Sequence, residues 1–186
     1  MKIKKLIIII YFLIIYLTTG FLFAQKNASE IVNENYKFSF TIPQESFNMR
    51  KEETTEKNAI TYEFETTLNS DTVGVLLIAF KYPDIKKIND FVYHMEKEVT
   101  LDIPQRTSEY IEFDSNYYDS KMAVYQGKIL THVIYYYRTK DETSQYNFNY
   151  ILRFKIFTKN YSDEILNYIK TIANNFIPRK NIVPSD

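Results

Sequence analysis

One stretch near the C-terminal end limits the folds available to this chain more than any other feature. Along residues 146–157, aromatic and aliphatic side chains occupy every second position, and mainly asparagine, arginine and lysine lie between them. Because successive side chains of a β-strand point to opposite faces, this pattern predicts a long strand with one face more apolar than the other. Long alternation of this kind favours antiparallel pairing. We therefore expect a sheet built from antiparallel pairs.

Other segments carry strand patterns of the same kind. They are residues 36–42, 60–64, 73–82, 110–113, 122–126 and 129–137. The nearly continuous apolar run at 73–82 is typical of a central strand covered on both faces. Gly74 within it predicts a β-bulge or a close backbone contact. The mixed charges of residues 50–58 predict an exposed loop.

Two segments have the three- and four-residue apolar spacing of amphipathic helices. The first begins at Asp84, the expected N-cap, and cannot continue through Pro104. The second begins at Ser162, whose side chain can cap it, and ends at Pro178. Strand groups with helices between them predict an α+β fold built in layers, with about six or seven antiparallel strands.

Residues 1–24 have the composition of a secretory signal peptide. Lysines without an acidic residue precede an unbroken apolar run, and we expect cleavage after Ala24. A retained anchor is the alternative, because residues 6–24 approach the roughly 20 apolar residues that span a bilayer. The chain contains no cysteine, so the lipid attachment of bacterial lipoproteins is excluded.

The predicted domain organisation follows from this segment. After the signal we expect a flexible lead-in at residues 25–35, a single domain at 36–177 and a C-terminal tail at 178–186. The expected location is the periplasm or the exterior of a bacterial cell. Attachment to the inner membrane follows only if the signal is not cleaved.

Charge and cysteine content exclude several classes of function. Without residues 1–24, the chain holds 20 basic and 23 acidic side chains, and its basic residues are not clustered. Nucleic-acid binding depends on clustered positive charge, so we expect no nucleic-acid partner. Without cysteine there is neither a thiolate nucleophile nor a disulfide.

The two histidines are the first candidates for catalysis. His94 lies in the first predicted helix, and His132 lies in a predicted strand, on the face that carries Ile134 and Tyr136. A catalytic histidine needs an orienting carboxylate and a nucleophile, and no G-x-S-x-G motif supplies them. We therefore predict no catalytic residue.

Metal and cofactor motifs are also missing from the sequence. There is no H-E-x-x-H motif, no cysteine cluster and no calcium loop, and Asp114 to Asn116 with Asp119 is expected to form a turn. The chain has only three glycines, so phosphate-cradling loops are not expected. No metal and no cofactor are predicted.

Adjacent tyrosines in two strand regions point to opposite faces of their strands. If helices cover both faces of the sheet, these rings belong to the core, which is the interpretation that the predicted fold favours. If one face is bare, the rings form an amphipathic surface suited to a protein partner. The candidate contact residues are Tyr117, Tyr118, Tyr135 and Tyr137.

The phrase from Tyr36 to Pro43, Y-K-F-S-F-T-I-P, resembles the opening strand of the Mog1/PsbP-like superfamily. The order of predicted elements agrees over residues 36–177, although Phe47 stands in the region where many members carry tryptophan. The resemblance implies an antiparallel β-sheet packed between helices, an α/β/α sandwich, and a role in binding proteins. Characterised relatives dock onto a Ran-family GTPase or onto photosystem II, and neither partner suits an exported bacterial protein.

These observations predict an exported, non-enzymatic module that binds a protein partner at the bacterial cell envelope. The alternative is a carrier of a small apolar ligand or lipid, which the aromatic-rich strands favour.

Overall fold

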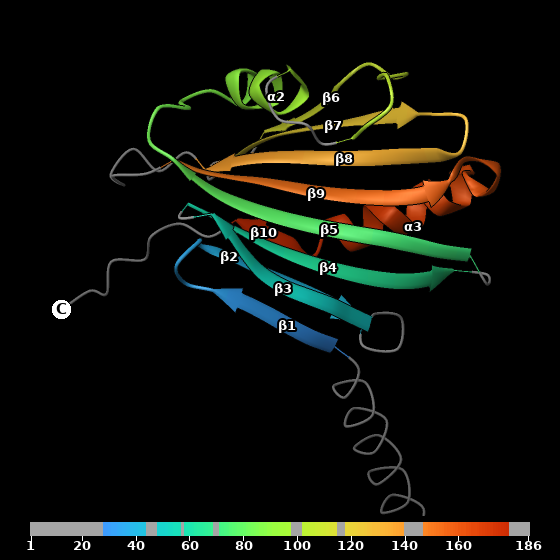
Figure 1. Ribbon diagram of the computed structural model, residues 1–186, viewed down its shortest axis with the longest axis horizontal. Helices are drawn as coiled ribbons and strands as arrows, with labels where there is room; N and C mark the ends of the chain where they lie inside the picture. Colours follow the sequence, from blue (N-terminus) through green and yellow to red (C-terminus); the bar gives the residue numbers. More distant parts are fainter. Residues whose placement is uncertain are drawn as a thin grey trace, which may run out of the picture.

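A computed structural model describes residues 28–43, 48–56, 58–68, 71–97, 102–114, 118–139 and 147–178. Over these ranges the chain forms two antiparallel sheets and two α-helices, which is an α+β fold (Figure 1). Neither helix in the described ranges has the length and apolar composition needed to cross a bilayer. The predicted signal peptide lies outside these ranges.

The larger sheet has seven strands in the order β3-β4-β5-β9-β8-β7-β6. In that order their bounds are Asn48–Glu56, Ala59–Leu68, Asp71–Tyr82, Asn147–Phe157, Leu130–Thr139, Tyr118–Gln126 and Ile111–Asp114. Each strand is antiparallel to its neighbours. The pairing of β5 with β9 joins an N-terminal group of strands to a C-terminal group.

Two expectations about the larger sheet are wrong: the loop at residues 50–58 and, of the two alternatives at Gly74, the bulge. Residues 50–58, predicted as a loop, contribute most of β3, because an edge strand pairs on one side only and tolerates charged residues. At Gly74, β5 keeps a regular register with both neighbours, opposite Glu65 and Lys155, so no bulge forms there.

The smaller sheet contains three strands in the order β1-β2-β10. They are Ala28–Asn33, Phe38–Pro43 and Phe176–Pro178. The predicted flexible lead-in is therefore wrong at residues 28–33, which pair with the whole of β2. This segment is ordered by its backbone pairing with β2 and by the packing of Ile31 against the core. Its side chains show no clear period, so the sequence did not indicate a strand.

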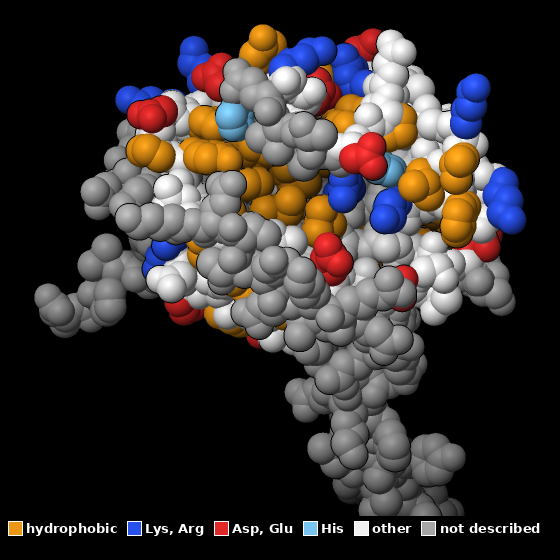
Figure 2. Space-filling model, in the orientation of Figure 1, with side chains coloured by type: hydrophobic (Ala, Val, Ile, Leu, Met, Phe, Trp, Pro, Cys, Tyr) orange, Lys and Arg blue, Asp and Glu red, His pale blue; other side chains and the backbone are white. Residues whose placement is uncertain are grey.

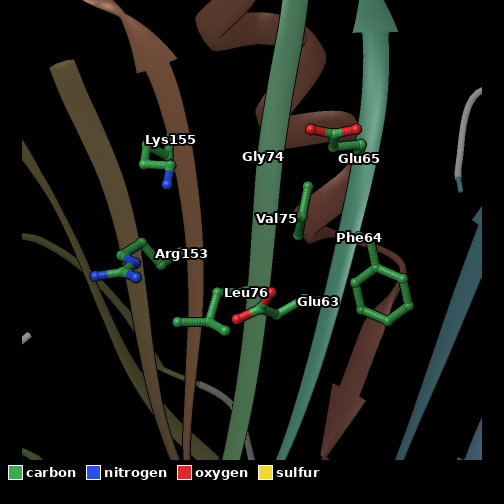
Figure 3. Close-up of a pocket in the computed structure, with 8 residues that line it drawn as sticks. All are labelled: Glu63, Phe64, Glu65, Gly74, Val75, Leu76, Arg153 and Lys155. Atoms are coloured by element: carbon green, nitrogen blue, oxygen red, sulfur yellow. The ribbon is translucent and has the colours of Figure 1, made fainter. Parts of the chain in front are cut away.

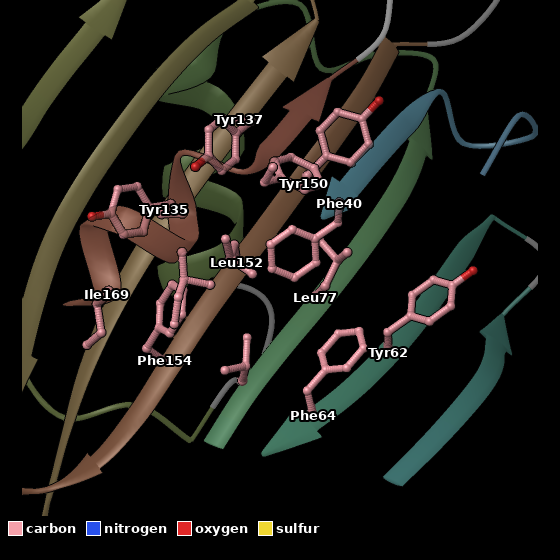
Figure 4. Close-up of a cluster of buried hydrophobic side chains, with 14 of the residues drawn as sticks. Phe40, Tyr62, Phe64, Leu77, Tyr135, Tyr137, Tyr150, Leu152, Phe154 and Ile169 are labelled. Atoms are coloured by element: carbon pink, nitrogen blue, oxygen red, sulfur yellow. The ribbon is translucent and has the colours of Figure 1, made fainter. Parts of the chain in front are cut away.

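The inner face of the larger sheet packs against α3 (Asp163–Ala173) and the smaller sheet. The Ser162 hydroxyl oxygen accepts a hydrogen bond from the backbone N–H of Ile165 at 3.3 Å, which confirms the predicted cap. The helix ends at Ala173, earlier than expected, because the chain turns there and enters β10. Figure 4 shows aromatic rings from both sheets meeting in this inner core.

The outer face of the larger sheet carries α2 (Ile88–Lys97). The helix buries Phe91, Val92 and Met95 against β7, β8 and one end of β5. It begins at Ile88, so Asp84 is not its N-cap as predicted; the preceding residues form a bend from which Ile85 packs into the same cluster.

Polar groups fix the position of α2 on the sheet. The Glu96 carboxylate accepts hydrogen bonds from the hydroxyls of Tyr110, at 2.6 Å, and Tyr125, at 2.5 Å. The Tyr125 hydroxyl also lies 3.0 Å from that of Tyr136. Burial, together with Glu96, raises the pKa of Tyr110 to about 12. These tyrosines are therefore neutral hydrogen-bond donors at physiological pH.

Candidate functional site

The tyrosines predicted as possible partner contacts fall into different environments. Tyr135 and Tyr137 are buried in the inner core, where burial raises the pKa of Tyr137 well above its usual value. Tyr118 is half-buried, and its ring lies edge-on to that of Tyr137, with centroids 5.9 Å apart. Tyr117 lies outside the described residues. The core interpretation therefore holds for Tyr135 and Tyr137, and the contact-surface interpretation of these two is wrong.

A different site emerges from the polar side chains on the outer face. The strand register aligns Glu65 on β4, Gly74 on β5 and Lys155 on β9 in one row across the sheet. The next row consists of Glu63, Leu76 and Arg153. We call these six residues the open face, because within the described part of the chain no helix covers them: Glu63 and Lys155 are exposed and the others half-buried.

The open face contains a shallow hollow of about 110 Å³. Figure 3 shows the two carboxylates on β4 and the two cationic side chains on β9, with Gly74 and Leu76 between them on β5. Gly74 forms the floor because it has no side chain. A Cβ atom at this position would lie 3.7 Å from Cε of Lys155, an ordinary contact, so strand geometry does not require glycine here.

His132 extends the first row beyond Lys155 and is 3% exposed. As predicted, it lies on the face that carries Ile134 and Tyr136. Neither ring nitrogen has a hydrogen-bond partner among the described residues. The ring lines the base of an open groove of about 340 Å³, which Asp102 and Lys128 also line.

Burial and the neighbouring cations keep the His132 ring neutral. Burial, with the cations Arg153 and Lys155, lowers the pKa of His132 to about 4, and Asp102 opposes this shift only in part. Burial also lowers the pKa of Arg153, against the opposing influence of Asp102 and Glu63. Asp102 is the carboxylate neighbour of His132, but no hydrogen bond joins the two groups.

The other histidine lies outside this site. His94 is half-buried, and its ring lies edge-on to that of Tyr82, with centroids 5.6 Å apart. It lines an open hollow of about 430 Å³ at the start of α2, together with Ile85 and Tyr93. No group of three or more His, Asp or Glu side chains within the described ranges is placed to hold a metal ion.

The sequence alone did not indicate the open face. Glu63, Arg153 and Lys155 occupy the polar positions of two alternating segments, which is the one signal that could have pointed to them. Their proximity depends on β5 lying between β4 and β9, and strand order is not encoded in the period of any one strand.

Comparisons with known proteins do not assign a family. No family model matches the chain, and no curated protein sequence matches it. A solved structure, that of LpqN, described as involved in cell envelope biogenesis of Mycobacterium tuberculosis, aligns with a TM-score of 0.47 and 11% sequence identity. The alignment covers 80% of this chain and 86% of that chain. Membership of the Mog1/PsbP-like superfamily therefore stays a prediction from the opening phrase and the order of elements.

Proposed function

We propose that this protein is an exported, non-enzymatic module that binds a protein partner at the bacterial cell envelope through the open face. The observation that carries the proposal is the opposition of Glu63 and Glu65 to Arg153 and Lys155 across an uncovered part of the sheet. The expected partner presents side chains of both charges.

The composition of the open face supports a protein ligand. Protein interfaces combine an apolar centre with a polar rim. Here Leu76 lies between the carboxylates on β4 and the cations on β9, and it is half-buried rather than sealed into the core. Charged groups on both sides would select the partner and its orientation, since like charges brought together are unfavourable.

The size of the hollow also favours a protein over a small molecule. Pockets for drug-sized ligands measure about 300–1,000 Å³, whereas this hollow measures about 110 Å³ and is open to solvent. A space of this size accommodates one protruding side chain, as happens where a residue of one protein anchors in another.

Reversing one charge of the open face is expected to weaken partner binding. Lys155→Glu puts a carboxylate on β9 where the partner is expected to meet a cation, so like charges would face each other and the dissociation constant of the complex should rise about tenfold or more. The partner would be captured from envelope extracts with the wild-type protein, identified and purified, and its binding measured by calorimetry.

Lys170→Glu is the matched control, because Lys170 is an exposed lysine on α3, which packs on the inner face. It makes the same charge change and should bind like the wild type. Equal binding by Lys155→Glu and wild type would show that the partner contacts another surface. Failure of wild-type protein to capture any saturable partner across detergents would overturn the proposed function itself.

A carrier of a small apolar ligand is the second candidate, and the hollow at the start of α2 favours it. At about 430 Å³ this hollow falls within the range of ligand pockets, and Tyr82, Ile85 and Tyr93 supply apolar lining. If it carries a ligand, native mass spectrometry of the protein purified from its source should show a bound mass, and Tyr93→Asp should lose that mass. A spectrum of protein alone would count against this candidate.

A further inference from the structure

The charges of the open face form two columns of opposite sign. Glu63 and Glu65 make an acidic column on β4, and Arg153 and Lys155 make a basic column on β9. β5 runs between the columns and contributes the half-buried side chain of Leu76. Neighbouring strands lie about 4.8 Å apart, so the backbones that carry the two columns are about 10 Å apart. Figure 2 shows this side of the molecule, where basic and acidic side chains lie close to apolar ones.

This arrangement of charges is complementary to itself under one rotation. A second copy can lie face to face with the first, related to it by a two-fold axis that runs along β5. The rotation exchanges the two sides of β5, so the acidic column of each copy faces the basic column of the other. Positions along the strand do not change, so residues of one register row meet each other. Glu65 then faces Lys155 of the second copy, and in the next row Glu63 faces Arg153 and Leu76 faces Leu76.

The shape of the outer face is compatible with this pairing. Rotation preserves the handed twist of a sheet, so the two sheets follow each other along β5, as aligned sheets do in β-sandwiches. α2 packs on β7 and β8, and it therefore lies beside the open face instead of over it. The rotation carries α2 of each copy to the β3 edge of the other copy. Each outer face thus has a low part and a raised part, and the low parts meet.

We propose that the open face binds the open face of a second copy of this chain and forms a two-fold symmetric dimer. This inference rests on the proposed function, because it names the protein that the open face binds. A partner for this face must present charges of both signs around an apolar centre, and the open face itself presents them. In a two-fold interface every contact occurs twice, so each opposed pair of charges contributes on both sides of the axis.

Two charge-reversed variants test the dimer by sedimentation equilibrium of the full-length protein. Glu63→Lys with Glu65→Lys makes the open face wholly basic, and Arg153→Glu with Lys155→Glu makes it wholly acidic. Like charges then face each other in each variant, so the dissociation constant of the dimer should rise about tenfold or more. An equimolar mixture should form a one-to-one heterodimer, which a misfolded variant could not do. Lys170→Glu, on the helix of the inner face, should dimerise like the wild type.

Three results would overturn the dimer: a wild-type protein that stays monomeric at its highest soluble concentration, dimers that persist equally in both charge-reversed variants, or variants that do not associate when mixed. Failure of the dimer is distinguishable from failure of the proposed function. A monomeric protein that still captures another envelope protein, and loses it on Lys155→Glu, would retain the function without the dimer. A protein that binds neither its own copy nor any envelope protein would refute both.

Discussion

Replacing Phe176 with alanine is expected to lower the free energy of unfolding by about 3–5 kcal/mol, the usual cost of removing a buried phenylalanine ring. Phe176 is 2% exposed, and its ring lies among four other aromatic rings of the inner core. The centroid distances are 5.6 Å to Phe38, 6.0 Å to Phe40, 4.9 Å to Tyr137 and 5.3 Å to Tyr150. The residue thus connects the smaller sheet to the larger one.

Urea denaturation followed by circular dichroism measures this effect. The adjacent residue provides the control, because the side chain of Ile177 points to solvent. Ile177→Ala should change the free energy of unfolding by no more than about 0.5 kcal/mol. Similar losses in the two variants would contradict the placement of β10 against the inner core.

Acidification is expected to destabilise the protein through His132. The pKa of His132 in the folded protein is about 4, below its ordinary value of about 6.5. Below pH 6.5 the unfolded chain therefore takes up a proton that the folded protein does not bind. The stability contributed by the neutral ring is complete above pH 6.5 and declines as the pH falls to 4. The expected loss is up to about 3 kcal/mol.

Two histidine variants separate the contribution of His132 to the pH dependence of stability from that of the carboxylates, which titrate over the same pH range. In His132→Gln, the loss of stability between pH 7 and pH 4 should be smaller than in the wild type by about that amount. His94→Gln is the matched control, because it makes the same substitution at a half-buried position outside this site. Urea midpoints at several pH values provide the comparison, and parallel curves for wild type and His132→Gln would refute the prediction.

The elements with the strongest periodic patterns were predictable from sequence. The alternation at residues 146–157 corresponds to β9, and the capping serine at 162 lies at the start of α3. Backbone pairing explains the failures. Residues 28–33 become ordered because β2 offers them a partner along its length, and no pattern in their own side chains records that. Residues 50–56 similarly acquire strand structure from β4.

The open face was less predictable than the fold, for a related reason. Arg153 is recognisable from the sequence as a polar position of a strand, but Glu63 lies on a strand 90 positions earlier and reaches it only across β5. His132 was assigned to the correct face, because alternation fixes the face of a strand. Its low pKa depends first on burial and then on the charges of Arg153 and Lys155, and alternation does not reveal these surroundings.

The pairing of β2 with β10 has a consequence for how the chain reaches its folded state. β2 lies near the start of the described chain and β10 at its end, so the smaller sheet stays incomplete until residues 176–178 are available. Contacts between such distant segments form slowly. A nascent or truncated chain therefore leaves the rings of Phe38 and Tyr150 without the ring that closes over them. Such a chain is expected to be a substrate for chaperones and proteases until synthesis is complete.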